Sequence, residues 1–250
     1  MKTTLLILGL LLASGAVSIP LAAETTSANR FDSTIQSKVA QLTTKKEFRK
    51  VQVSVEDGIV TLTGNVDLYQ QKLAMAKKVR KIANVQGVRN LIAVTGNISD
   101  AQLTAALDRK LYYDRLAQDN VFNYVTASAE NGVVTLSGET RNEFDRDSAL
   151  SLVDNTTGVK DVIDNIKVAP VSIFDDQIRI SALRAIYRDP VLSRYALDPA
   201  KPIRIVVDRG HLSLCGTVAN MMDKQIAGIR ASQVFGAFTV QNNLQVQKKS

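Results

Sequence analysis

The chain contains one cysteine, one histidine and no tryptophan in 250 residues. A single cysteine cannot form an internal disulfide bond, and one histidine with one cysteine cannot build a His/Cys metal cluster. Aromatic residues make up 5% of the chain, which argues against aromatic-lined sugar clefts and base-stacking platforms. We therefore expect no metal, no cofactor and no nucleic-acid partner, although the sequence pI is about 9.5.

Long hydrophobic runs are also scarce. The run Leu5–Leu12 follows Lys2 and precedes the small residues Ala13–Ala16, which is the order of a secretory signal and predicts one over residues 1–23. Cleavage after Ser18 and cleavage after Ala23 both fit, and a buried N-terminal helix is the alternative to a signal. The run is shorter than the ~20 residues of a spanning helix. We expect a soluble, exported or periplasmic protein, and not a lipoprotein, because no cysteine lies at the cleavage site.

Three segments of the chain read alike. Each has an alternating apolar strand, a turn with glycine, a second strand, and another glycine six residues after the first. A Gly-Val or Gly-Ala step follows about 20 residues later. The repeated turn and step glycines are Gly58, Gly64 and Gly87, then Gly132, Gly138 and Gly158, then Gly210, Gly216 and Gly236.

The spacing predicts the secondary structure of each copy. Asp57-Gly58 and Asn131-Gly132 are strong hairpin signals, since both central residues of such turns need positive φ, and Arg209-Gly210 is a weaker version. Helical apolar stripes precede each hairpin, and a second helix with a final strand follows it. The stripes are Ile35/Val39/Leu42, Leu103/Leu107/Leu111 and Ile178/Ala182/Ile186.

The second helix of copy one is expected over about residues 68–83, with Leu73, Ala76, Val79 and Ala83 facing inward. The link from the second strand to the third crosses over this helix, so these two strands should be parallel. The fold class is therefore α+β: three tandem αββαβ domains, each a three-stranded mixed sheet covered on one face by two helices. We place them at residues 30–98, 99–170 and 171–248, joined by short linkers.

This unit resembles the BON domain, named for bacterial osmotically inducible and nodulation proteins. The resemblance rests on the strand–DG–strand–Gly block, the GV step and strands such as Val162–Ile166. Copy three is divergent, with Ala237 in the GV step and Arg209 in the turn. The resemblance implies a cell-envelope location and a role in binding phospholipid surfaces or protecting the envelope under osmotic or other stress.

Charge is segregated along the chain. Copy one carries a net charge of +7, copy two −5 and copy three +5. The densest basic cluster is on the second helix of copy one and comprises Lys72, Lys77, Lys78, Arg80 and Lys81. Near an anionic membrane each cation contributes about 1 kcal/mol, so we expect these residues to bind anionic phospholipid. The alternative for this helix is a solvated face, and for the protein an interaction module that is a chaperone or an oligomeric scaffold.

An enzymatic reading is weak, and we expect no catalytic residues. Cys215 occupies the position of Thr63 and Ser137 in the other copies, and His211 that of Ile59 and Val133. Four residues along a strand separate Cα atoms by about 13 Å, so the pair does not form a dyad. Acidic residues after Glu139 suit a helix start. The sequence leaves open the lipid or partner, the oligomeric state and the inducing stress.

Overall fold

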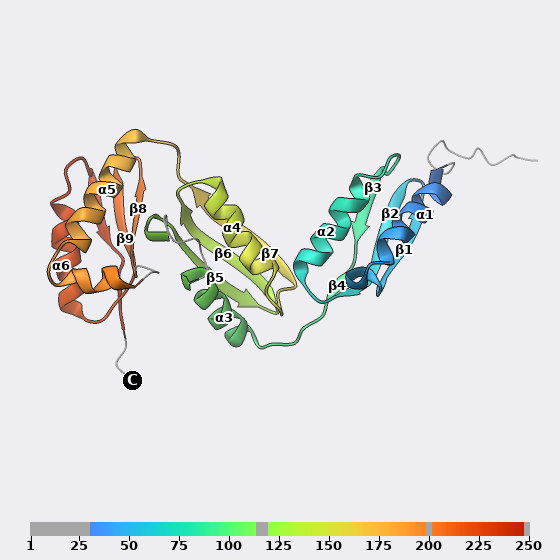
Figure 1. Cartoon of the computed structure of the whole chain (residues 1–250), viewed down its shortest axis with the longest axis horizontal. Helices are drawn as coiled ribbons and strands as arrows, with labels where there is room; N and C mark the ends of the chain where they lie inside the picture. The colour runs from blue at the N-terminus through green and yellow to red at the C-terminus, as the bar shows by residue number, and fades with distance from the viewer. Residues whose placement is uncertain (1–30, 114–119, 199–201, 248–250) are drawn as a thin grey trace, which may run out of the picture.

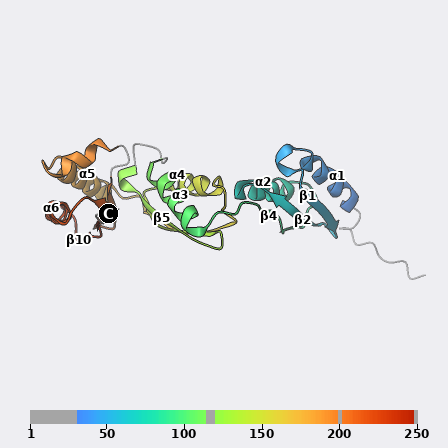
Figure 2. The ribbon, with the colours of Figure 1, turned by 90° about the horizontal axis from the view of Figure 1, so that it is seen from below.

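The computed structural model describes residues 31–113, 120–198 and 202–247. The predicted signal at residues 1–23 lies outside them. Three small αβ units follow one another along an elongated chain (Figure 1), and in each unit the helices cover one face of the sheet (Figure 2). The α+β class with three tandem αββαβ units is confirmed.

The three units have the same order of elements up to the last strand, with a short 3₁₀ helix after each first helix, which in unit one is η2 (Lys46–Phe48). Unit one contains α1 (Asp32–Thr43), β1 (Val51–Glu56), β2 (Ile59–Val66), α2 (Tyr69–Arg80), β3 (Gly87–Asn90) and β4 (Ala93–Val94). Unit two contains α3 (Asp100–Tyr113), η3 (Asn120–Phe122), β5 (Tyr124–Glu130), β6 (Val133–Thr140), α4 (Glu143–Asp154) and β7 (Asp161–Val168). Unit three contains α5 (Ile173–Tyr187), η4 (Leu192–Leu197), β8 (Ile203–Asp208), β9 (His211–Val218), α6 (Met221–Ser232), β10 (Thr239–Asn242) and β11 (Gln245–Val246).

The second strand of each unit is the centre of its sheet. It pairs antiparallel with the first strand and parallel with the last, as the crossover helix requires. The hairpin turns have positive φ at both central residues, for example 50° at Asp57 and 75° at Gly58. Arg209 has the same conformation, with φ 48°, so the weaker turn sequence of unit three still forms the same hairpin.

The last strand is divided in units one and three, which corrects the expected strand count there. The break follows Asn90 in unit one, where the side-chain amide donates to the carbonyl of Lys72 on α2 and its oxygen accepts the N–H of Ile92. Asn242 makes the same two bonds in unit three. Ile92 and Leu244 then turn into the core, each 1% exposed, and the strand resumes as β4 or β11.

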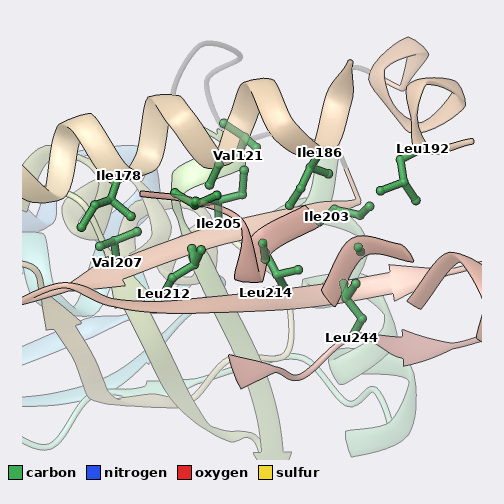
Figure 3. Close-up of a cluster of buried hydrophobic side chains, with 14 of the residues drawn as sticks. Val121, Ile178, Ile186, Leu192, Ile203, Ile205, Val207, Leu212, Leu214 and Leu244 are labelled. Carbon is green, nitrogen blue, oxygen red and sulfur yellow. The ribbon is translucent and has the colours of Figure 1, made fainter. Parts of the chain in front are cut away.

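The helical stripes face the sheets as predicted. Of the nine stripe residues, all are buried except Leu42, which is partly buried. Figure 3 shows Ile178 and Ile186 of α5 above Leu212 and Leu214 of β9. On α2 the expected inward face is partly wrong: Ala76 and Val79 are buried, but Leu73 is 41% exposed and Ala83 is also exposed. Met75 fills the core instead.

Candidate interaction surfaces

An aspartate at the start of the first helix fastens the hairpin turn in every unit. Asp32 accepts the backbone N–H groups of Asp57 and Gly58, both at 2.8 Å. Asp100 does the same for Asn131 and Gly132, and Asp175 for Arg209 and Gly210. Such charge-assisted pairs are the stronger class of hydrogen bond. We call this end of each unit its tip. The aspartate holds the turn in place, and so fixes the backbone that carries the side chains exposed at the tip.

The basic cluster on α2 is only partly a single surface. At about 100° per residue, Lys77 and Lys81 fall on the side of the helix opposite buried Val79, with Arg80 beside them on its flank, and all three are exposed. Lys78 is partly buried, with its Nζ 4.9 Å from the centre of the Phe48 ring. Lys72 lies on the sheet side, beside Ile92–Asn97 and Lys160 of unit two. We call Lys77, Arg80 and Lys81 the basic face.

A junction between units one and two joins α2 to β7. The Tyr69 hydroxyl donates to Asp161 at 2.7 Å, and its ring packs into the core of unit two. Burial and the bond to Asp161 both raise the pKa of Tyr69. Burial raises the pKa of nearby Asp154 to about 6. The basic face is at the other end of α2, away from these acidic groups.

The junction between units two and three is more extensive. Val121 of η3 is 2% exposed and belongs to the core of unit three. Arg204 on β8 is 5% exposed, donates to the Asn120 carbonyl and stacks 5.2 Å from the centre of the Tyr112 ring. Tyr112 donates to Asp198 at 3.2 Å. Tyr112 thus joins two units. A cavity of about 280 Å³ lies beside these residues.

Cys215 and His211 make separate contacts. Both are on β9, where the His211 Nδ1 is 2.7 Å from the Thr239 hydroxyl and Cys215 is 8% exposed. Burial raises the pKa of the Cys215 thiol to about 11. Because the thiolate is the reactive form, this thiol is suited to packing rather than to nucleophilic attack.

We expect Cys215 to react with an aromatic disulfide reagent at pH 7 at least about tenfold more slowly in the folded chain than in urea, since its thiolate is scarce and shielded. Absorbance of the released thiolate measures the rate. The matched control is Ser137→Cys in a Cys215→Ser background, because Ser137 holds the same sheet position in unit two and is exposed. Equal rates for the two thiols would contradict the packing role.

Sequence reasoning missed an aromatic cluster at the tip of unit three. Phe174, Phe235 and Phe238 are 78%, 95% and 80% exposed and line one groove. When the copies are aligned on the backbone bond to the turn glycine, the two corresponding positions of the loop after the second helix hold Ala83 and Gln86 in unit one and Thr157 and Lys160 in unit two. The predicted step glycine Gly87 is not equivalent to Gly158 and Gly236, because Asn84, with φ 69°, occupies their place. Only an alignment of the three copies by position reveals the substitution by phenylalanine.

Among residues 31–113, 120–198 and 202–247, no group of three or more His, Cys, Asp or Glu side chains is arranged to hold a metal ion. The helices in that part of the chain are each too short or too polar to cross a bilayer.

The fold is that of a protein built from tandem αββαβ modules. The sequence model of the BON domain matches residues 31–96, 99–170 and 185–248, and the chain belongs to the BON domain family. The third match begins at residue 185, inside α5. The resemblance inferred from the repeated glycines is confirmed in all three copies.

Two solved structures show weak similarity to the chain. One is CdsD, described as a structural protein of the type III secretion system of Chlamydia trachomatis, with 15% identity, 86% of this chain and 92% of that chain covered, and a TM-score of 0.26. Another is the PrgH periplasmic domain, with 12% identity, 80% and 96% coverage and a TM-score of 0.19. No curated protein matches the chain.

Proposed function

We propose that this protein is a non-enzymatic component of the cell envelope that binds anionic phospholipid surfaces through the basic face of α2 and supports envelope integrity under osmotic or other stress. Membership of the BON family supports the envelope location. The observation that carries the lipid proposal is the exposure of Lys77, Arg80 and Lys81 together at the C-terminal end of one helix.

The placement of these cations suits reversible binding to a charged surface. Each lysine or arginine close to an anionic leaflet adds about 1 kcal/mol to the binding free energy. The attraction decays within a Debye length of about 8 Å at physiological salt. The net charge of +7 on residues 30–98 adds to the attraction, while the acidic middle copy does not. Binding through this face is therefore orienting, salt-sensitive and peripheral.

Charge reversal tests the basic face. We expect the variant Lys77→Glu, Arg80→Glu, Lys81→Glu to bind phosphatidylglycerol-containing vesicles at least ~100-fold more weakly in 50 mM salt, because three attractions become repulsions. Co-sedimentation across a salt series measures the affinity. Lys78 is left in place, since it stacks on Phe48 and its loss would disturb the core.

The matched control reverses Lys38, Lys45 and Lys46, which are exposed lysines of the same unit. This variant has the same net charge as the test variant but keeps the basic face. Equal loss of binding in both would show that net charge, and not the face, governs binding. Full binding by the test variant would exclude the face altogether.

A protein-interaction role is the second candidate, and one observation favours it. β1 is an edge strand of its sheet, and its residues Gln52, Ser54 and Glu56 are exposed. An exposed edge can accept an added strand from a partner. Crosslinking of envelope extracts that traps a partner at β1, with no vesicle binding, would favour this role over lipid binding.

A further inference from the structure

The tip of unit three displays apolar side chains that project into solvent. We define the apolar tip as Ile173, Phe174, Phe235 and Phe238, which are 75% to 95% exposed. The three phenylalanines surround a groove of about 570 Å³ between the first turn of α5, the Arg209-Gly210 turn and the loop after α6. A contiguous patch of four large, exposed apolar side chains marks an interaction site rather than ordinary protein surface.

The other two units do not expose such a tip. The backbone N–H of Phe238 donates to the Gly210 carbonyl, and Gln86 and Lys160 make the same bond to Gly58 and Gly132. Phe238 therefore stands where the other copies have polar side chains, and its ring lies over Gly210.

The linker before unit two covers the corresponding place there, because Ile98 lies against Gly158. Ile173 precedes its clamping Asp175 by the same two residues by which Ile98 precedes Asp100. In unit three, however, the helix begins two residues earlier relative to that aspartate. Ile173 is thus carried outward on the first helical turn, and the groove beside Gly236 stays open.

Charge around the tip favours an anionic surface. Asp175 is occupied by the two N–H groups of the turn, and Asp176 by Arg179 and Arg141. The side chain of Arg209 is 80% exposed at the rim of the groove, 4.0 Å from Asp208. An anionic headgroup layer would therefore meet a cation beside the phenylalanines, with the helix-start carboxylates already neutralised.

The start of α5 and the end of α2 lie on the same side of the molecule (Figure 1). In Figure 1 the first turn of α5 and the last turn of α2 both lie along the upper edge of the elongated molecule. Side chains that project from a helix start and a loop, with basic groups near them, fit the boundary between headgroups and acyl chains.

We propose that the apolar tip of unit three inserts into this boundary of an anionic bilayer, and so gives the protein a second contact with lipid. This inference rests on the proposed phospholipid binding and adds a site to it. Phe174, Phe235 and Phe238 enter the interface, Arg209 contacts headgroup phosphates, and the basic face of α2 engages the same leaflet. The tip contact is apolar, so it persists in salt that screens the basic face.

The absence of tryptophan from the chain makes insertion directly measurable. Phe235→Trp in the full mature chain supplies a single tryptophan at the tip, whose emission can be excited apart from that of the tyrosines. We expect phosphatidylglycerol/phosphatidylcholine vesicles to shift its emission to shorter wavelength, and lipids brominated on the acyl chain to quench it at least about twofold more than a control. The control is Met222→Trp, which is exposed at the opposite end of α6.

A second variant, Phe174→Ser with Phe235→Ser and Phe238→Ser, is expected to lose about tenfold of the binding that remains in 0.5 M salt, while circular dichroism and low-salt binding through the basic face persist. Vesicles that bind the Phe235→Trp chain without shifting or quenching its emission would overturn the tip but leave the proposed function standing. Failure of the unaltered chain to bind vesicles would overturn both. A shift that appears without lipid and grows with protein concentration would identify the tip as a protein contact and overturn its insertion.

Discussion

Gly64→Ala is expected to destabilise unit one by more than about 3 kcal/mol, among the largest effects for a single methyl group. A Cβ on Gly64 would lie 2.0 Å from the carbonyl oxygen of Lys50, and the residue has φ +94°. That oxygen already accepts the N–H of Asn65 at 3.3 Å, so backbone on both strands would have to move. Gly138 and Gly216 face Tyr124 and Pro202 in the same way, at 2.0 and 1.9 Å.

Gly87→Ala is the matched control, since Gly87 lies in the same unit and sheet. The nearest atom to a Cβ there is Ile59 Cγ1 at 3.9 Å, and its φ is outside the left-handed region. We expect a change within about 0.5 kcal/mol, because alanine also reduces the entropy of the unfolded chain. Urea unfolding monitored by circular dichroism compares the two variants. Similar midpoints would mean that the sheet absorbs the methyl group at Gly64.

This contrast also shows what a repeat can predict. The spacing of glycines predicted the hairpins and the second strand. Each of these glycines is needed for a local reason, because the turn has positive φ or because a neighbouring strand approaches closely. The first-helix stripes were predicted well for the same reason, since periodicity reports a local face. The BON family followed from these local patterns.

Features set by contacts between segments were not predictable. Leu73 and Met75 both belong to an apolar pattern on α2, and only packing against the sheet selected Met75 for the core. The strand breaks depend on Asn90 and Asn242 reaching a helix carbonyl. Periodicity carries no information about such partners. Lipid binding by the basic face remains a prediction. Of the five basic residues predicted to bind lipid, Lys77, Arg80 and Lys81 are exposed.

The junction of units two and three is the clearest case of such a contact. The repeat pattern predicts three separate αββαβ domains, whereas Val121 from unit two fills part of the core of unit three. It lies in a short segment between a helix and a strand, where no periodic signal exists. Because unit two packs there, the face of β8 that points away from the core of unit three is also buried. Arg204 lies on this face and is therefore only 5% exposed.

Arg204→Ala is expected to uncouple the two units and to cost about 3 kcal/mol. The variant removes the donor to the buried Asn120 carbonyl and the cation above the Tyr112 ring, and a buried polar group that loses its charged partner is costly. Hydrogen exchange read by mass spectrometry should show protection falling together in β5 and β8, while β2 of unit one is unchanged. Arg209→Ala is the control, because that arginine lies on the same hairpin with its side chain 80% exposed. If protection falls in β8 alone, or equally in the control, Arg204 does not couple the units. If it falls in both strands, units two and three behave as one cooperative body, and that body holds the apolar tip in a fixed direction relative to the acidic middle unit.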